Sequence, residues 1–124
     1  MNYSIQLTVQ KMPLKKFNEI YPKGYSTDTE RVTIIRNCLP MVYGVTYDQI
    51  NVRSRKRELC EPRQHYMAML RKYTKLGYKN IAKEFKLDHS TAIHAIHTIL
   101  NLLDSDKRLK QTHSKFIAEI ESRL

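Results

Sequence analysis

Residues 88–95 read Asp-His-Ser-Thr-Ala-Ile-His-Ala and decide the fold, because they follow a short apolar segment after a two-residue turn. Apolar residues at helical spacing predict a short helix over residues 79–85 and a tight turn at Lys86-Leu87. Asp88 has the short acceptor side chain that is typical of a helix N-cap. We therefore predict a second helix over about residues 89–103 and, with the first, a helix-turn-helix. The expected core face of this second helix is Ile93, Ile96, Leu100 and Leu103.

The segment that precedes the basic part of the chain also has a helical period. Residues 29–43 are expected to form a helix capped by Asp28 or Thr29, with Pro40 kinking it or ending it near Cys38. Residues 44–51 then form a connector, whose apolar side chains pack beneath it.

Two more helices complete the expected fold. One should run from Pro62, at its first position, to Thr74, because proline fits the first turn of a helix. The last is expected after a cap at Ser105 or Asp106. The predicted fold class is all-α, a helical bundle with a helix-turn-helix and a short N-terminal extension. The expected domains are an extension over residues 1–27 and a helix-turn-helix domain over residues 28–124.

The positive charge of the chain is concentrated in one segment. The formal net charge is +10 over 124 residues, and residues 51–87 carry eleven Lys and Arg against three Glu. Such a concentration is typical of a site for a polyanion, although a solvated basic face is the simpler alternative.

Composition excludes several classes of function. Glycine occurs only at Gly24, Gly44 and Gly77, too few and too scattered for a phosphate-cradling loop, so no ATPase is expected. Cys38 and Cys60 lack metal-ligand spacing, and reduced thiols are expected rather than a disulfide. No apolar run has the length of a membrane span. The histidines lack a completing carboxylate or thiol, and no catalytic set recurs, so we expect no metal, no cofactor and no enzyme activity.

Two motifs in this part of the chain suit a nucleic acid. In the first, residues 53–57 read Arg-Ser-Arg-Lys-Arg and residues 61–64 read Glu-Pro-Arg-Gln. The second is the stretch of residues 88–95 quoted above, some 25 positions further on. An arginine in an extended segment is suited to the minor groove of duplex DNA, and the other cations to phosphates. The short polar residues that open the predicted helix at residue 89 are suited to base edges or phosphates. The candidate DNA-contacting residues are Arg53, Arg55, Lys56, Arg57, Arg63, Gln64, Asp88, His89, Ser90 and Thr91.

Asp88 is unusual beside DNA, because phosphates repel a carboxylate. It either caps its helix, which is the simpler interpretation, or accepts a hydrogen bond from a cytosine amine.

Together the two motifs closely resemble the C-terminal DNA-binding domain of the bacterial replication initiator DnaA. That family shows Arg-Pro-Arg-Gln, then Asp-His-Thr-Thr-Val-Leu-His-Ala, and the resemblance covers residues 28–124. It implies a helix-turn-helix of the Trp-repressor type that binds short DNA boxes. By this resemblance Arg55 enters the minor groove, while Arg63, Gln64 and Thr91 contact phosphates. It also implies that Asp88, His89 and Ser90 read the major groove.

The sequence departs from that pattern at three places. Ser90 stands where the family has Thr, Glu61 replaces a basic residue, and Lys86-Leu87 is one residue shorter than the family's Gly-Gly-Arg. These changes bear on the DNA sequence that is recognised more than on binding itself.

Sequence-specific binding of double-stranded DNA, in replication initiation or its regulation, is therefore the leading hypothesis. The expected setting is a bacterial cytoplasm, at the nucleoid, with a bacterial or phage source. The chain is expected to be a stand-alone relative without the ATPase domain, or else an excised fragment. The alternatives are a helix-turn-helix transcriptional regulator, or a protein-interaction module that contacts a replication protein through residues 1–27.

For residues 1–27, the alternation of Ile5, Leu7 and Val9 favours a short strand or an extended arm. The oligomeric state is left open.

Overall fold

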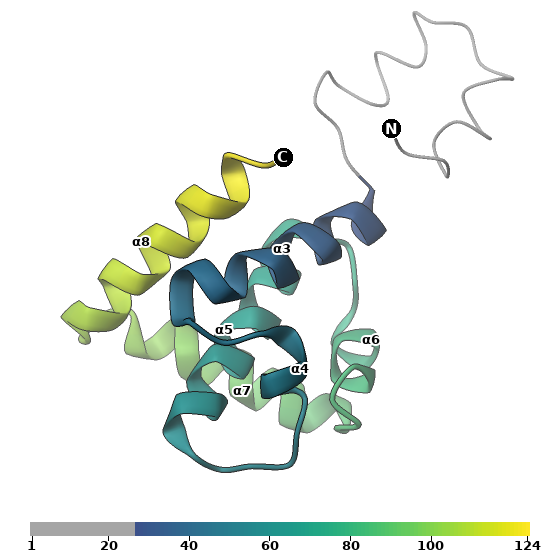
Figure 1. Ribbon diagram of the computed structural model, residues 1–124. Helices are drawn as coiled ribbons and strands as arrows, with labels where there is room; N and C mark the ends of the chain where they lie inside the picture. The colour runs from purple at the N-terminus through teal and green to yellow at the C-terminus, as the bar shows by residue number, and fades with distance from the viewer. Residues whose placement is uncertain (1–26) are drawn as a thin grey trace, which may run out of the picture.

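A computed structural model describes residues 27–124, which fold into six α-helices (Figure 1). No strand occurs within this described range, so the prediction of an all-α fold is confirmed. The predicted extension, residues 1–27, lies outside it apart from its last residue. The helices are α3 (Asp28–Tyr43), α4 (Tyr47–Ile50), α5 (Arg57–Tyr73), α6 (Tyr78–Lys83), α7 (His89–Leu102) and α8 (Lys107–Glu121).

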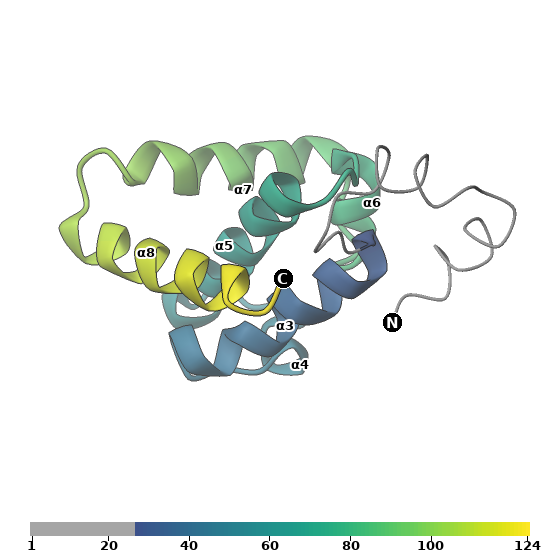
Figure 2. The same cartoon turned by 90° about the horizontal axis from the view of Figure 1, so that it is seen from above.

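Helix α5 lies at the centre of the bundle. It packs against α3 on one side and α7 on the other, with α8 beside α3 and α6 beside α7 (Figure 2). Residues 65–70 of α5 are all buried, which is a wider stretch than one helical stripe would give. Burial on so much of its circumference is expected of a helix that is surrounded by others.

Helix α3 begins one residue earlier than predicted and ends at Tyr43, the last residue of the predicted range. Its N-cap is Thr27, whose hydroxyl accepts a hydrogen bond from the Glu30 N–H, so neither Asp28 nor Thr29 is the cap. The helix also continues past Pro40 to Tyr43, and the expected end near Cys38 is wrong. A proline removes its own N–H from the helix and crowds the carbonyl four residues before it, and here this disturbance falls in the last turn of α3. Gly44, with φ of +70°, supplies the left-handed residue that terminates it.

The start of α5 also differs from the prediction. The helix begins at Arg57, so Pro62 is its sixth residue rather than its first. The N–H groups of Leu59 and Cys60 donate to the Lys56 carbonyl, and the first turn is therefore complete before the proline. Pro62 costs one hydrogen bond, to the Glu58 carbonyl, and its buried ring packs inside the fold.

The helix-turn-helix is formed by α6 and α7, as predicted. The turn places Lys86 in the left-handed region with φ of +56°, which is uncommon for a residue with a side chain. The predicted core face of α7 was partly wrong, because Leu100 is 45% exposed and Ile93 only partly buried. The buried face of α7 is instead Ala92, Ala95, Ile96 and Ile99. The small side chains of the two alanines let α7 pack closely on α5.

The connector and the last helix follow the predictions. Residues 47–50 form the short helix α4, and Ile50 is fully buried beneath it. Asp106 caps α8 by accepting from the Leu109 N–H, and Leu109, Phe116 and Ile120 face the core.

A cluster of polar groups around Glu84 joins four helices. Its Oε1 accepts hydrogen bonds from Arg36 Nη2 of α3 at 2.7 Å, Tyr47 Oη of α4 at 3.0 Å and Tyr66 Oη of α5 at 2.7 Å. Arg36 also donates from Nε to Tyr66 Oη and lies over the ring of Tyr47. Burial alone would lower the pKa of Arg36, but the hydrogen bonds to Tyr66 and Glu84 raise it on balance, so the guanidinium stays charged. The end of α6 is thereby fixed to α3, α4 and α5.

A second buried chain of polar groups crosses the bundle at His65, which is fully buried in α5. Its Nδ1 is hydrogen-bonded with the Tyr43 hydroxyl of α3 at 2.6 Å, and its Nε2 with His113 Nδ1 of α8 at 2.9 Å. A neutral imidazole offers one donor and one acceptor, which suits a position between two such groups. Burial, with a smaller effect of His113, lowers the pKa of His65 to about 3. Sequence reasoning did not identify this histidine as a core residue.

The His65 chain makes stability depend on pH. Because the folded pKa lies below the ordinary value of 6.5, the unfolded chain takes up a proton that the folded protein does not. The stabilising contribution is complete above about pH 6.5 and is lost as pH falls toward about 3, with a slope of at most about 1.4 kcal/mol per pH unit. His65→Gln should flatten this dependence in urea unfolding curves measured between about pH 5 and about pH 7.

The matched control is His97→Gln, at an exposed position of α7, which should keep the wild-type slope. An unchanged slope in His65→Gln would contradict the assignment of the effect to His65.

Candidate nucleic-acid interface

The N-terminus of α7 presents the second motif to solvent. Asp88 Oδ1 accepts hydrogen bonds from the Thr91 N–H at 2.9 Å and the Thr91 hydroxyl at 2.8 Å. These two bonds, with a smaller effect of His89, hold the pKa of Asp88 below its usual range. The capping interpretation of Asp88 is therefore confirmed, and its second oxygen lies free of these bonds. His89 and Ser90 are exposed in the first turn, the position from which a helix can reach a ligand.

A hollow beside this N-terminus brings lysines of α6 close to His89. It is lined by Tyr78, Lys79, Lys83, Leu87, Asp88 and His89. Neither Lys79 nor Lys83 was among the candidate DNA-contacting residues identified from the sequence. Lys83 is exposed at the end of α6, one helical turn after Lys79, and this spacing could have identified it.

The basic loop, defined here as residues 51–56 between α4 and α5, lies on the other side of the turn. A hollow between the loop and the turn is lined by Val52, Arg53, Ser54, Arg55, Arg63, Phe85, Lys86 and Leu87. Arg53, Arg55 and Lys86 are all exposed. The structure therefore brings the first motif next to the helix-turn-helix, although the two are separated by about thirty residues in sequence.

Arg63 and Gln64 lie inside α5 rather than at its start. The Arg63 guanidinium donates to the carbonyl oxygens of Ile50, Val52 and Ser54, so it faces the basic loop. Gln64 is partly buried. Phosphate contacts for these two residues stay a prediction.

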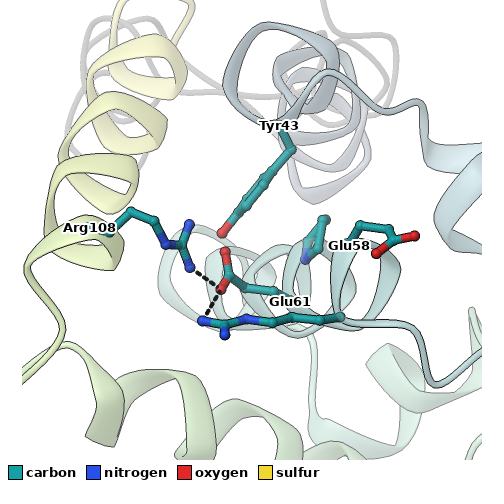
Figure 3. Close-up of a pocket in the computed structure, with 6 residues that line it drawn as sticks. Tyr43, Glu58, Glu61 and Arg108 are labelled. Atoms are coloured by element: carbon teal, nitrogen blue, oxygen red, sulfur yellow. Dashed lines mark hydrogen bonds and ion pairs between the residues drawn. The ribbon is translucent and has the colours of Figure 1, made fainter.

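Lys56 and Arg57 stand where the basic loop enters α5. Lys56 is the exposed N-cap residue of the helix. Arg57 lies 3.9 Å from Glu61 in an open hollow that faces α8 rather than α7. Figure 3 shows this hollow, with Arg108 of α8 directed at the Glu61 carboxylate and Tyr43 above it. Glu61, the acidic departure from the family pattern, therefore links α5 to α8.

Other kinds of site find no support in residues 27–124. Within that range no three His, Cys, Asp or Glu side chains come together as metal ligands, and His94 and His97 are exposed on α7. Cys38 and Cys60 are free thiols. No helix in the described part of the chain has the length and apolar character needed to cross a membrane.

Comparison with known proteins decides the family. The family described as bacterial dnaA protein helix-turn-helix matches residues 33–99, which include both motifs, all of α5 and most of α7. The chain belongs to this family.

Several chromosomal replication initiator proteins DnaA are similar to this DnaA-family chain. That of Desulfotalea psychrophila is 32% identical over 77 residues, covering 62% of this chain and 16% of the relative. That of Chlamydia muridarum, DnaA 1, is 42% identical over 66 residues, covering 53% and 14%. That of a Thermoanaerobacter strain is 29% identical over 123 residues, covering 98% and 25%. The chain thus spans at most a quarter of the length of these relatives. No solved structure matches it.

The longer matches bear on residues 1–27. A match that covers 98% of the chain must extend through most of this segment, which the motifs had left outside the resemblance. The DnaA relative of Flavobacterium psychrophilum likewise covers 97% of the chain at 27% identity. The boundary at residue 28 stays a prediction.

Replacement of Asp88 separates capping from charge. Asp88→Ala removes the acceptor for the Thr91 N–H and should lower the melting temperature by a few degrees, whereas Asp88→Asn keeps a capping oxygen and should change it little. Thermal unfolding followed by circular dichroism measures both. If Asp88→Ala melts with the wild type, the cap does not stabilise α7.

Proposed function

We propose that this DnaA-family domain binds double-stranded DNA sequence-specifically through α7 and the basic loop. The observation that carries the proposal is the arrangement of cations around the N-terminus of α7. Lys79 and Lys83 line the hollow on one side of the helix start, and Arg53, Arg55 and Lys86 line the hollow on the other. A polyanion that follows this surface would meet positive charge on both sides of His89.

The residues of the two motifs are suited to different contacts with DNA, some to the grooves and others to the phosphates. The exposed first turn of α7 is suited to the major groove, where His89 and Ser90 would face base edges. Arg55 in the basic loop is suited to the narrow minor groove, whose negative potential attracts arginine. Lys56, Arg57 and the lysines of α6 would neutralise phosphates, a contribution that is independent of sequence.

The names of the relatives extend the proposal to a process. Each matched protein is described as a chromosomal replication initiator, so we infer a role in replication initiation or its regulation. The DNA site would resemble the boxes that this family binds. The proposed location follows from the ligand, at the DNA of a bacterial cell.

The departures from the family pattern at Glu61 and at the Lys86-Leu87 turn are the features that would favour the protein-interaction alternative. Both departures have structural roles, since Glu61 pairs with Arg108 and the Lys86-Leu87 turn still delivers Asp88 as a helix cap. Lys86 also adds a cation to the surface beside Arg55. These observations favour a domain that binds DNA over one that keeps the fold but has lost DNA binding.

Arg55 and His89, the two residues proposed to contact the grooves, should contribute separately to specific binding. Arg55→Ala and His89→Ala should each weaken binding to the preferred duplex by about 1–3 kcal/mol, because each removes a groove contact. Fluorescence anisotropy with a labelled duplex carrying the family's box and a scrambled duplex, across a salt series, measures affinity and preference together. Both affinities should fall steeply as salt rises, because several phosphates are neutralised.

The matched control is His97→Ala, an exposed position two turns further along α7, which should bind as the wild type does. If neither Arg55→Ala nor His89→Ala weakens binding to the preferred duplex, the assignment of reading residues is wrong. If the wild-type protein binds neither duplex at low salt, DNA is not its ligand.

A further inference from the structure

Arg63 has an unusual set of partners for a cation on a DNA-facing side of a protein. Its Nε donates to the Ile50 carbonyl at 2.8 Å, its Nη2 to the Val52 carbonyl at 2.8 Å and its Nη1 to the Ser54 carbonyl at 3.2 Å. Three carbonyls, spaced two residues apart, therefore converge on one guanidinium. The loop backbone wraps around the side chain, and Arg63 holds its shape from inside.

Neighbouring contacts reinforce this arrangement. The Cys60 thiol donates to the same Ser54 carbonyl at 3.3 Å, and the Ser54 hydroxyl accepts from the Lys56 N–H at 3.2 Å. The Ser54 N–H donates to the Val52 carbonyl at 3.1 Å. The backbone on either side of Arg53 and Arg55 is thus fixed, while both arginine side chains stay exposed.

The start of the loop is tied to the helix-turn-helix by a second contact. Asn51 Nδ2 donates to the Glu84 carbonyl at 3.0 Å and to the Tyr47 hydroxyl at 3.1 Å. Glu84 is the C-cap residue of α6, four residues before Asp88. A short chain of contacts therefore runs from Arg63 through the loop to Glu84, where the turn into α7 begins.

We propose that Arg63 is a positioning residue for DNA recognition, which sets the spacing between Arg55 and the N-terminus of α7. The inference rests on the proposed function, and it assigns Arg63 a role different from the phosphate contact expected of it. Three of its donors point at backbone carbonyls, that of Ile50 at the end of α4 and two in the basic loop, and only the fork of a guanidinium reaches three such acceptors at once. In this proposal the guanidinium of Arg63 holds the backbone of the loop in place, and Arg55 contacts the minor groove.

A test without DNA uses the trypsin sites of the loop. Cleavage after Arg53, Arg55, Lys56 or Arg57 requires the loop to open locally. Arg63→Lys keeps the positive charge but loses the fork, and we expect cleavage in the loop to become faster by on the order of tenfold, because about two hydrogen bonds are lost. Mass spectrometry of the first fragments identifies the cleaved bond. Arg123→Lys, at the pair with Glu119 on α8, is the matched control and should be cleaved like the wild type.

Equal rates of loop cleavage in Arg63→Lys and the wild type would overturn the proposal. Should Arg63→Lys not fold, the wild-type protein decides: slow hydrogen exchange of the Arg63 Nε–H in NMR spectra supports the contact with Ile50, and exchange at the rate of a free guanidinium overturns it.

A second test measures the consequence for DNA with a double-mutant cycle. If Arg63 positions Arg55, Arg63→Lys should reduce the preference for the specific duplex by about as much as Arg55→Ala, with little further loss in the double variant. Binding to the scrambled duplex and the salt dependence should not change, because no charge is removed. An unaltered preference in Arg63→Lys, or additive losses on both duplexes, would overturn the positioning role.

The two tests separate this inference from the proposed function. If the wild-type protein binds no duplex, the proposed function fails and the trypsin comparison alone decides whether Arg63 holds the loop.

Discussion

The carboxylate of Glu84 is the contact on which the rest of the interface depends. It accepts hydrogen bonds from α3, α4 and α5 at the point where α6 ends and the turn into α7 begins. A carboxylate with 15% of its side chain exposed is stable only because a charged guanidinium and two hydroxyls surround it. Loss of any one partner would leave the others incompletely paired. This requirement favours one placement of α6 over the many that apolar packing would allow.

The chain of Tyr43, His65 and His113 starts from the residue of α5 that precedes Tyr66, and it joins α5 to α3 and α8. Apolar side chains fill space without direction, whereas these hydrogen bonds have defined partners and distances. Because α3 is bonded to α5 both through Arg36 and Tyr66 and through Tyr43 and His65, sliding of α3 along that helix would break at least one of these contacts. The helix-turn-helix is therefore carried by a frame with little freedom to shift, which suits the proposed match of its surface to DNA.

Local signals in the sequence were sufficient for the parts of the fold that are built locally. The caps at Asp88 and Asp106 and the tight turn at Lys86-Leu87 each depend on residues within four positions of one another. The start of α5 was missed, because a proline that fits a first position is also tolerated at the sixth when the preceding turn is complete. The face of α7 was misjudged, because hydropathy ranks Ile93 and Leu100 above the alanines that face α5.

The contacts that sequence reasoning could not supply are those between distant residues. Nothing in the sequence around Arg36, Tyr47 or Glu84 marks these residues as partners. Only the fold brings Glu84 to the other two, which lie 48 and 37 positions before it. The same holds for Arg63, whose three partners lie 9 to 13 positions upstream, at the end of α4 and in the basic loop, which has no regular period. The motifs therefore predicted candidate contact residues, and the fold was needed to show which residues hold the segments that carry them.

Positioning matters here because charge alone gives affinity without specificity. A basic surface binds any duplex, and a mobile arginine arm would enter any narrow minor groove. If the basic loop is held at a fixed distance from α7, both groove contacts form together only on a duplex whose two reading sites have that spacing. A duplex that satisfies one contact then gains little from the other. Specificity in this domain would thus come from the rigid backbone around Arg63 as much as from the side chains that touch the bases.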